Sequence, residues 1–177
     1  LLFTDADCRI TSENWILEMT SHFSLKKTIV LGYGAYNKSK GSVLNKIIRF
    51  DAVISAIQYF SWAKIGKPYM GIGRNLAYKK SEFFNVNGFI NHIRVRSGED
   101  DLFINEAANA SNTTICYSPE SFTYSEPKTT FKEWLNQKRK ETSTKKHYKS
   151  FDKLQLALYF ISQLSCIILA IILLYFQ

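Results

Sequence analysis

The chain has 177 residues, of which 46% are hydrophobic and 15% aromatic, so it can bury one core of ordinary domain size. Its formal net charge of +8 favours an anionic partner, which can be nucleic acid, a phosphorylated substrate or a membrane surface. Three cysteines without a Cys-x-x-Cys spacing argue against a disulfide framework and against a zinc site.

Strand and helix patterns alternate along most of the chain. The first half predicts a buried strand at 1–4, a helix from residue 11 or 12 to about 22, a strand at 28–31, a loop through 42 and a long amphipathic helix at 43–65. The second half predicts a strand with a glycine-rich middle at 69–78, a short helix at 80–86, a helix at 98–109, a strand at 113–117 and a basic helix at 129–141. This order is typical of an α/β domain.

The C-terminal third changes from basic to apolar. Residues 128–153 hold nine Lys or Arg against three acids, and Leu154–Phe176 is an uncharged run of 23 residues. A run of this length can span a hydrocarbon core of about 30 Å, although a buried core helix is the alternative. The basic flank favours membrane headgroups over nucleic acid and predicts that the flank is cytoplasmic.

We therefore expect three parts: a globular α/β domain at 1–126, a basic membrane-proximal helix and linker at 127–153, and a transmembrane helix at 154–176. The chain begins on a core strand without an initiator Met, so we interpret it as a fragment of a longer protein. The localisation that we predict is the inner or plasma membrane, with the globular part in the cytoplasm.

Two carboxylates, Asp5 and Asp7, directly follow the first predicted strand. Alternate side chains of an extended segment can point the same way, so both can converge on one hard divalent cation. A solvated turn is the alternative explanation for such a triplet. The position after an apolar strand favours the metal site.

A glycine-rich stretch runs from Gly71 through Gly73 and Arg74 to Asn75. It is not a dinucleotide-binding fingerprint, because Leu76 takes the place of the third glycine. We expect a loop whose glycines let substrate approach the backbone, with Arg74 available to a phosphate or carboxylate. A simple strand bulge is the alternative.

Three acids, Glu99, Asp100 and Asp101, begin a predicted helix. Acids in a first turn stabilise the helix dipole, which is sufficient reason for them to be there. The functional alternative makes one of them a general base, since neighbouring carboxylates raise each other's pKa.

The basic helix contains Gln137, Arg139 and Lys140. A helix of this composition can simply face solvent or lipid headgroups. The functional alternative is cationic stabilisation of a departing diphosphate.

Taken in order, these motifs resemble the family 2 glycosyltransferases, inverting enzymes of GT-A fold related to cellulose, chitin and hyaluronan synthases. The resemblance covers residues 1 to about 141 and implies part of a GT-A fold, without the first βαβ half that holds the nucleobase. It implies that Asp5 and Asp7 hold Mn²⁺ or Mg²⁺ and the donor diphosphate, and that Asp100 is the base. Glu99 and Asp101 would support it.

The same resemblance implies that the stretch containing Gly71, Gly73, Arg74 and Asn75 lines the donor and acceptor pocket. The family's Gln-x-x-Arg-Trp motif is degraded here. Gln137 fits, Lys140 and Glu141 replace Arg and Trp, and Arg139 could supply the cation from the neighbouring position. This departure argues against the processive members.

The resulting hypothesis is a membrane-anchored glycosyltransferase. It would move a sugar from a nucleotide donor, UDP- or GDP-linked, to a hydroxyl of a glycan, polysaccharide or lipid-linked sugar. One alternative is a non-catalytic module of the same fold that binds a nucleotide sugar or a partner enzyme. A nucleotidyltransferase, which would release pyrophosphate, is the other.

Overall fold

The structure, a computed structural model, describes residues 1–95 and 97–176. Its larger sheet has the strand order β1-β5-β3-β6. The strands are β1 (Leu2–Phe3), β5 (Leu76–Tyr78), β3 (Ile29–Leu31) and β6 (Thr113–Ile115). The β3–β6 pair is parallel, whereas β5 runs antiparallel to both of its neighbours. The protein is therefore mixed α/β, in agreement with the coarse prediction.

A second, three-stranded sheet was not expected from the sequence. It has the order β2-β7-β4 and contains β2 (Arg9–Ile10), β7 (Thr123–Ser125) and β4 (Gly34–Tyr36). The chain passes from the first sheet to the second between Leu31 and Gly34. The predicted strand at 69–78 is wrong over its first part, because only Leu76–Tyr78 is a strand and Gly73–Asn75 forms a 3₁₀ turn, η1.

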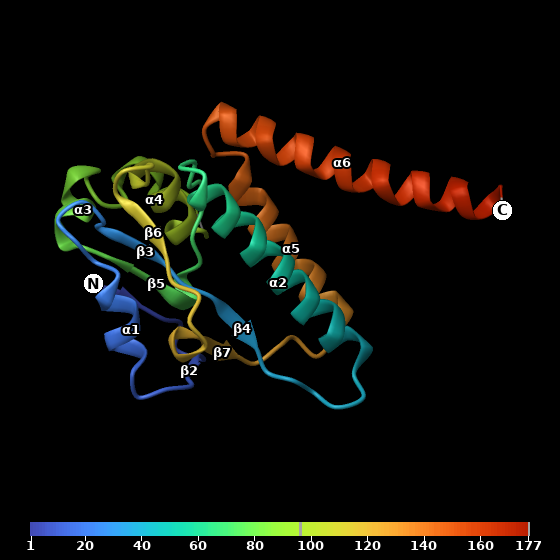
Figure 1. The fold of residues 1–177 in the computed structure, drawn as a ribbon, viewed down its shortest axis with the longest axis horizontal. Coiled ribbons are helices and arrows are strands. Elements are labelled where there is room, and N and C mark those ends of the chain that lie inside the picture. The colour runs from blue at the N-terminus through green and yellow to red at the C-terminus, as the bar shows by residue number, and fades with distance from the viewer. Residues whose placement is uncertain (96, 177) are drawn as a thin grey trace.

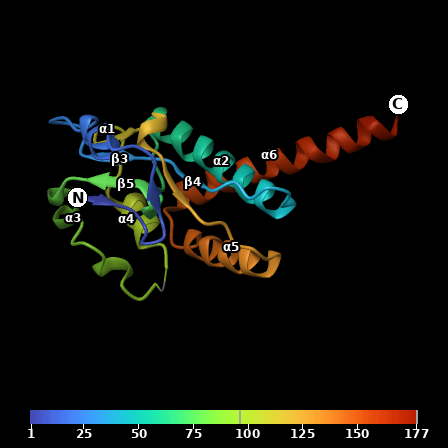
Figure 2. The ribbon, with the colours of Figure 1, turned by 90° about the horizontal axis from the view of Figure 1, so that it is seen from below.

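Six α-helices accompany the sheets among the described residues. They are α1 (Trp15–Ser21), α2 (Val43–Lys64), α3 (Lys80–Asn85), α4 (Glu99–Ala107), α5 (Phe131–Lys145) and α6 (Ser150–Tyr175). Two further 3₁₀ turns are η2 (Ile90–His92) and η3 (Pro119–Ser121). Figures 1 and 2 show α2 and α5 on the same side of the sheets, while α6 projects away from them toward the C-terminus.

The long helices begin where the sequence supplies N-cap residues. The Ser42 hydroxyl accepts a hydrogen bond from the Asn45 backbone N–H at the start of α2. The Thr130 hydroxyl does the same for the Glu133 N–H at the start of α5. The predicted bounds of α2 are confirmed to within one residue, and α5 continues four residues beyond its predicted end at Glu141.

The main core lies between the larger sheet, α2 and α4. Its fully buried large side chains include Tyr59, Tyr69, Phe103 and Ile104. A smaller cluster, which includes Trp15 and Met19, packs α1 on the other face of the sheet.

Helix α6 has two different parts. Its apolar part is long and apolar enough to cross a membrane, and none of it is buried within the chain. Its first turns instead dock on the domain: Asp152 is buried and accepts a hydrogen bond of 2.8 Å from the Asn105 amide of α4. Helix α6 thus begins at Ser150, four residues before the predicted start, and its added turn lies against the domain.

Candidate active site

Strand register brings the first acidic motif to the glycine-rich turn. In the antiparallel β1–β5 pair, Leu2 faces Ala77 and Phe3 faces Leu76. Continuing this register by two residues sets Asp5 opposite Arg74. Residues 69 places apart in sequence thus meet at one end of the sheet.

Asp5 and Asp7 converge through a tight turn, and not through the extended segment that we expected. The turn is closed by a hydrogen bond of 3.0 Å from the Cys8 N–H to the Asp5 carbonyl. One side-chain ligand atom from each of Asp5, Asp7 and Cys8 lies within 4.8 Å of the other two. The two carboxylates offer the hard oxygen ligands that Mg²⁺ and Mn²⁺ prefer, whereas the Cys8 thiol does not suit Mg²⁺.

The Asp5 carboxyl has a perturbed pKa. Partial burial raises the pKa most, the neighbouring Asp7 raises it further, and the positive charge of Arg74 opposes both. Both carboxylates remain solvent-exposed, and exposed acidic pairs also occur without a metal.

Arg74 is held by the second sheet. Its Nη1 donates to the Ala35 carbonyl at 3.3 Å and to the Ser125 hydroxyl at 3.1 Å. Its guanidinium also stacks 4.2 Å from the centre of the Tyr36 ring. Because five N–H donors are available and only one nitrogen is used by these bonds, Arg74 keeps donors for an anionic ligand.

Asp100 is attached directly to the glycine-rich turn. The Gly73 backbone N–H donates to Asp100 Oδ2. Burial raises the pKa of Asp100, and the hydrogen bond from Gly73 partly opposes that rise. A carboxylate with a raised pKa is a stronger base, and here its orientation is fixed by a backbone donor.

The neighbouring acids differ in their surroundings. Asp101 is buried, and this burial raises its pKa well above the usual value, with the Asp100 charge as the next cause. Glu99 is exposed and does not line the cleft described below, although its charge contributes to the raised pKa of Asp5. Gly98 is the N-cap of α4. Its φ of +78° favours glycine, and the Thr144 side chain of α5 packs against it.

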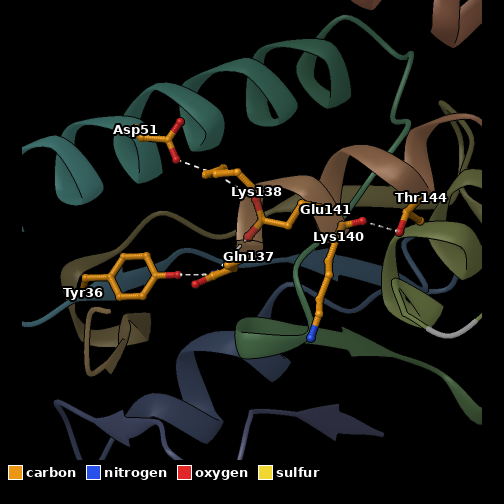
Figure 3. Close-up of polar contacts among 7 residues, drawn as sticks. All are labelled: Tyr36, Asp51, Gln137, Lys138, Lys140, Glu141 and Thr144. Atoms are coloured by element: carbon orange, nitrogen blue, oxygen red, sulfur yellow. Dashed lines mark hydrogen bonds and ion pairs between the residues drawn. The ribbon is translucent and has the colours of Figure 1, made fainter. Parts of the chain in front are cut away.

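Helix α5 contributes Gln137 and Lys140 to the same site. The Gln137 amide donates to the Tyr36 hydroxyl and to Glu141 Oε1, each at 3.0 Å. Figure 3 shows the Lys140 side chain extending from α5 toward the strands, and both Gln137 and Lys140 line the cleft. Arg139 is exposed and does not line it. The structure therefore favours Lys140 over Arg139 as the cationic side chain that α5 contributes to the cleft.

All these elements border one cleft of about 610 Å³. Eight of the residues selected from the sequence line it, namely Asp5, Asp7, Gly73, Arg74, Asp100, Asp101, Gln137 and Lys140. They come from the turn after β1, from η1, from α4 and from α5, which are far apart in the sequence.

Two other selected residues lie in the interior. Gly71 is buried, and a Cβ placed there would lie 3.1 Å from side-chain atoms of Ile104 and Leu31. Asn75 is fully buried: its amide donates to the carbonyls of Tyr33 and Ser121, and its Oδ1 accepts from the Trp15 indole. Their roles in this conformation are structural, because neither faces the cleft.

Sequence reasoning missed the wall that α2 contributes. Asp51, Ser55 and Gln58 line the cleft, and Asp51 forms an ion pair of 2.6 Å with Lys138 of α5. Figure 3 shows this pair joining the two helices. The spacing of these three residues, i, i+4 and i+7 in a largely apolar helix, was the available signal.

No protein-family model matches the sequence, and no curated protein matches it either. The resemblance to family 2 glycosyltransferases therefore remains a prediction, which rests on the motifs.

Proposed function

We propose that the protein is a membrane-anchored glycosyltransferase that transfers a sugar from a nucleotide-diphospho-sugar to a hydroxyl acceptor with inversion. The observation that carries the proposal is the cleft itself. It combines the acid pair Asp5 and Asp7, the cations Arg74 and Lys140, and the oriented carboxylate of Asp100. A GT-A fold is part of the proposal.

The donor diphosphate is assigned to one end of the cleft. Asp5 and Asp7 would hold Mn²⁺ or Mg²⁺, which when bound supplies positive charge to the two phosphates and to the leaving group. Arg74, beside Asp5, and Lys140, on α5, add positive charge from the protein. An anionic leaving group thus meets cationic groups on two sides.

Asp100 is proposed as the general base. Its carboxylate takes the proton of the acceptor hydroxyl as that oxygen bonds to the anomeric carbon, while the bond from this carbon to the diphosphate oxygen breaks. The Gly73 N–H holds the carboxylate in one orientation during the step. Attack opposite the leaving group inverts the configuration.

Anchoring is assigned to α6, and Lys145, Lys146, Lys149 and Lys153 precede or begin its apolar part. Under the positive-inside rule this arrangement supports a cytoplasmic catalytic domain on the inner or plasma membrane. The acceptor is a glycan, a polysaccharide or a lipid-linked sugar.

The test is nucleoside-diphosphate release by the membrane-embedded protein, with a panel of UDP- and GDP-sugars, extracted acceptors, and Mn²⁺ either present or chelated. Metal-dependent release with one donor would support the proposal. Metal-dependent nucleotide binding without release from any donor would indicate the non-catalytic module. Release of pyrophosphate would indicate a nucleotidyltransferase.

A further inference from the structure

Helix α2 has an apolar face that no part of the described chain covers. At helical spacing, Val43, Ile47, Phe50 and Ile57 are all exposed, and Val53 lies beside them. Val43 is 65% exposed, Phe50 68% and Ile57 56%. We call this set the outward face of α2.

The other sides of α2 are already occupied. Leu44, Ile48, Ala56 and Tyr59 are buried against the domain. Asp51, Ser55 and Gln58 face the cleft. A helix that is apolar on its solvent side as well as its core side normally has a further apolar environment.

The charges around the outward face select among environments. Lys46 and Lys64 lie on or beside it, and both are exposed. The one acid of α2, Asp51, is on the cleft side and pairs with Lys138. Apolar side chains bordered by lysines fit an anionic lipid surface, whereas a twofold contact between copies would bring like charges together.

The position of α2 agrees with this choice. Just after its C-terminal end, the Lys67 ammonium lies 4.7 Å from the centre of the Phe151 ring in the first turn of α6. Helix α6 is the one described helix that is long and apolar enough to cross a bilayer. The chain that follows the C-terminal end of α2 therefore contacts the first turn of α6.

We propose that the outward face of α2 lies in the headgroup and acyl boundary of the bilayer that α6 crosses. This inference rests on the membrane anchoring in the proposed function, but not on sugar transfer. The face spans about 21 Å from Val43 to Ile57 at about 1.5 Å per residue, with side chains reaching about 5–10 Å into the lipid. Because α2 also lines the cleft, this contact holds the cleft beside the membrane.

The experiment places a photoreactive benzoylphenylalanine at single positions of the full chain in nanodiscs of phosphatidylcholine and phosphatidylglycerol. The test positions are Phe50 and Ile57. Leu25, 99% exposed in the loop before β3, is the matched apolar control, and Leu169 of α6 tests the anchoring itself. Products are identified by mass spectrometry.

We expect the yield of lipid adducts at Phe50, Ile57 and Leu169 to exceed the yield at Leu25 by about tenfold or more. The first three positions would lie in lipid, whereas Leu25 would lie in water. Lipid adducts at Leu169 with none at Phe50 and Ile57, or crosslinks from those two to a second copy or another protein, would overturn the inference alone. Absence of lipid adducts at Leu169 as well would overturn the membrane anchoring.

Discussion

Replacing Gly73 with alanine should disable the proposed base while leaving the fold intact. A Cβ at this position would lie 2.9 Å from Asp100 Oδ2 and 3.3 Å from its Cγ. This is the same carboxylate oxygen that accepts the Gly73 N–H. Asp100 must therefore move, because the added methyl group and the hydrogen bond compete for one place.

The magnitude follows from what the carboxylate loses. A hydrogen bond to a charged group contributes about 1.5–3 kcal/mol, and about 1.4 kcal/mol corresponds to a tenfold change in rate. We expect kcat to fall about 10- to 100-fold, in the range of effects from misplacing a catalytic group by about 1 Å. Gly73 is not among the residues with positive φ, so alanine introduces no backbone strain and unfolding should change little.

The assay is metal-dependent nucleoside-diphosphate release in membranes, together with thermal unfolding of the purified protein. Gly71→Ala is the matched control, since its Cβ would press on Ile104, Leu31 and Leu76 in the core. It should lower stability by about 1–3 kcal/mol and leave turnover per folded molecule nearly unchanged. Full turnover by Gly73→Ala would refute the role assigned to the Gly73–Asp100 contact.

Three further predictions concern the surroundings of the cleft. Burial raises the pKa of Asp101 above its unfolded value of about 3.9, so this carboxyl lowers stability progressively as pH rises from about 4 through the folded pKa. Asp101→Asn should then raise the melting temperature more near pH 8 than near pH 4, and an equal shift at both would contradict the burial argument. Lys140→Ala should raise the donor KM by about tenfold or more, while Arg139→Ala should leave it unchanged, as donor titrations of both variants would show. Because both partners of the Asp51–Lys138 pair are partly exposed, a double-mutant cycle with Asp51→Asn and Lys138→Met should give a coupling below about 1 kcal/mol in thermal unfolding, and a larger value would show a tighter connection between α2 and α5.

Local features of the sequence were enough to predict the bounds of α2 to within one residue, and those of α5 to within two residues at its start and four at its end. Ser42 and Thr130 cap α2 and α5, and helical periodicity extends over 22 residues in α2. Three adjacent acids after Gly98 correctly predicted the start of α4. Such features act within one or two turns, and they can be recognised without knowledge of distant partners.

The second sheet could not be predicted, because its strands are two or three residues long and pair across large separations. Arg9 pairs with Tyr124, and Tyr36 pairs with Ser125. Two or three residues carry no usable alternation. The turn at η1 was also missed, since it depends on Asn75 bonding to carbonyls of Tyr33 and Ser121.

The sequence identified several residues that line one cleft, but it did not predict what surrounds them. The motifs containing Asp5, Asp100 and Gln137 are recognisable by residue type and order, and the structure brings them to one cleft. The burial of Gly71 and Asn75, and the contribution of α2 to the cleft, depend on packing that no local pattern encodes.

The most direct measurement compares sugar transfer and nucleotide binding in wild type and Asp100→Asn, using the same membrane preparation with Mn²⁺. We predict that Asp100→Asn lowers nucleoside-diphosphate release by about 10²–10⁴-fold, as expected for loss of a general base, and leaves nucleotide affinity within about twofold. Transfer at the wild-type rate would contradict the proposed mechanism, because Asp100 would then not be the group that takes the acceptor's proton.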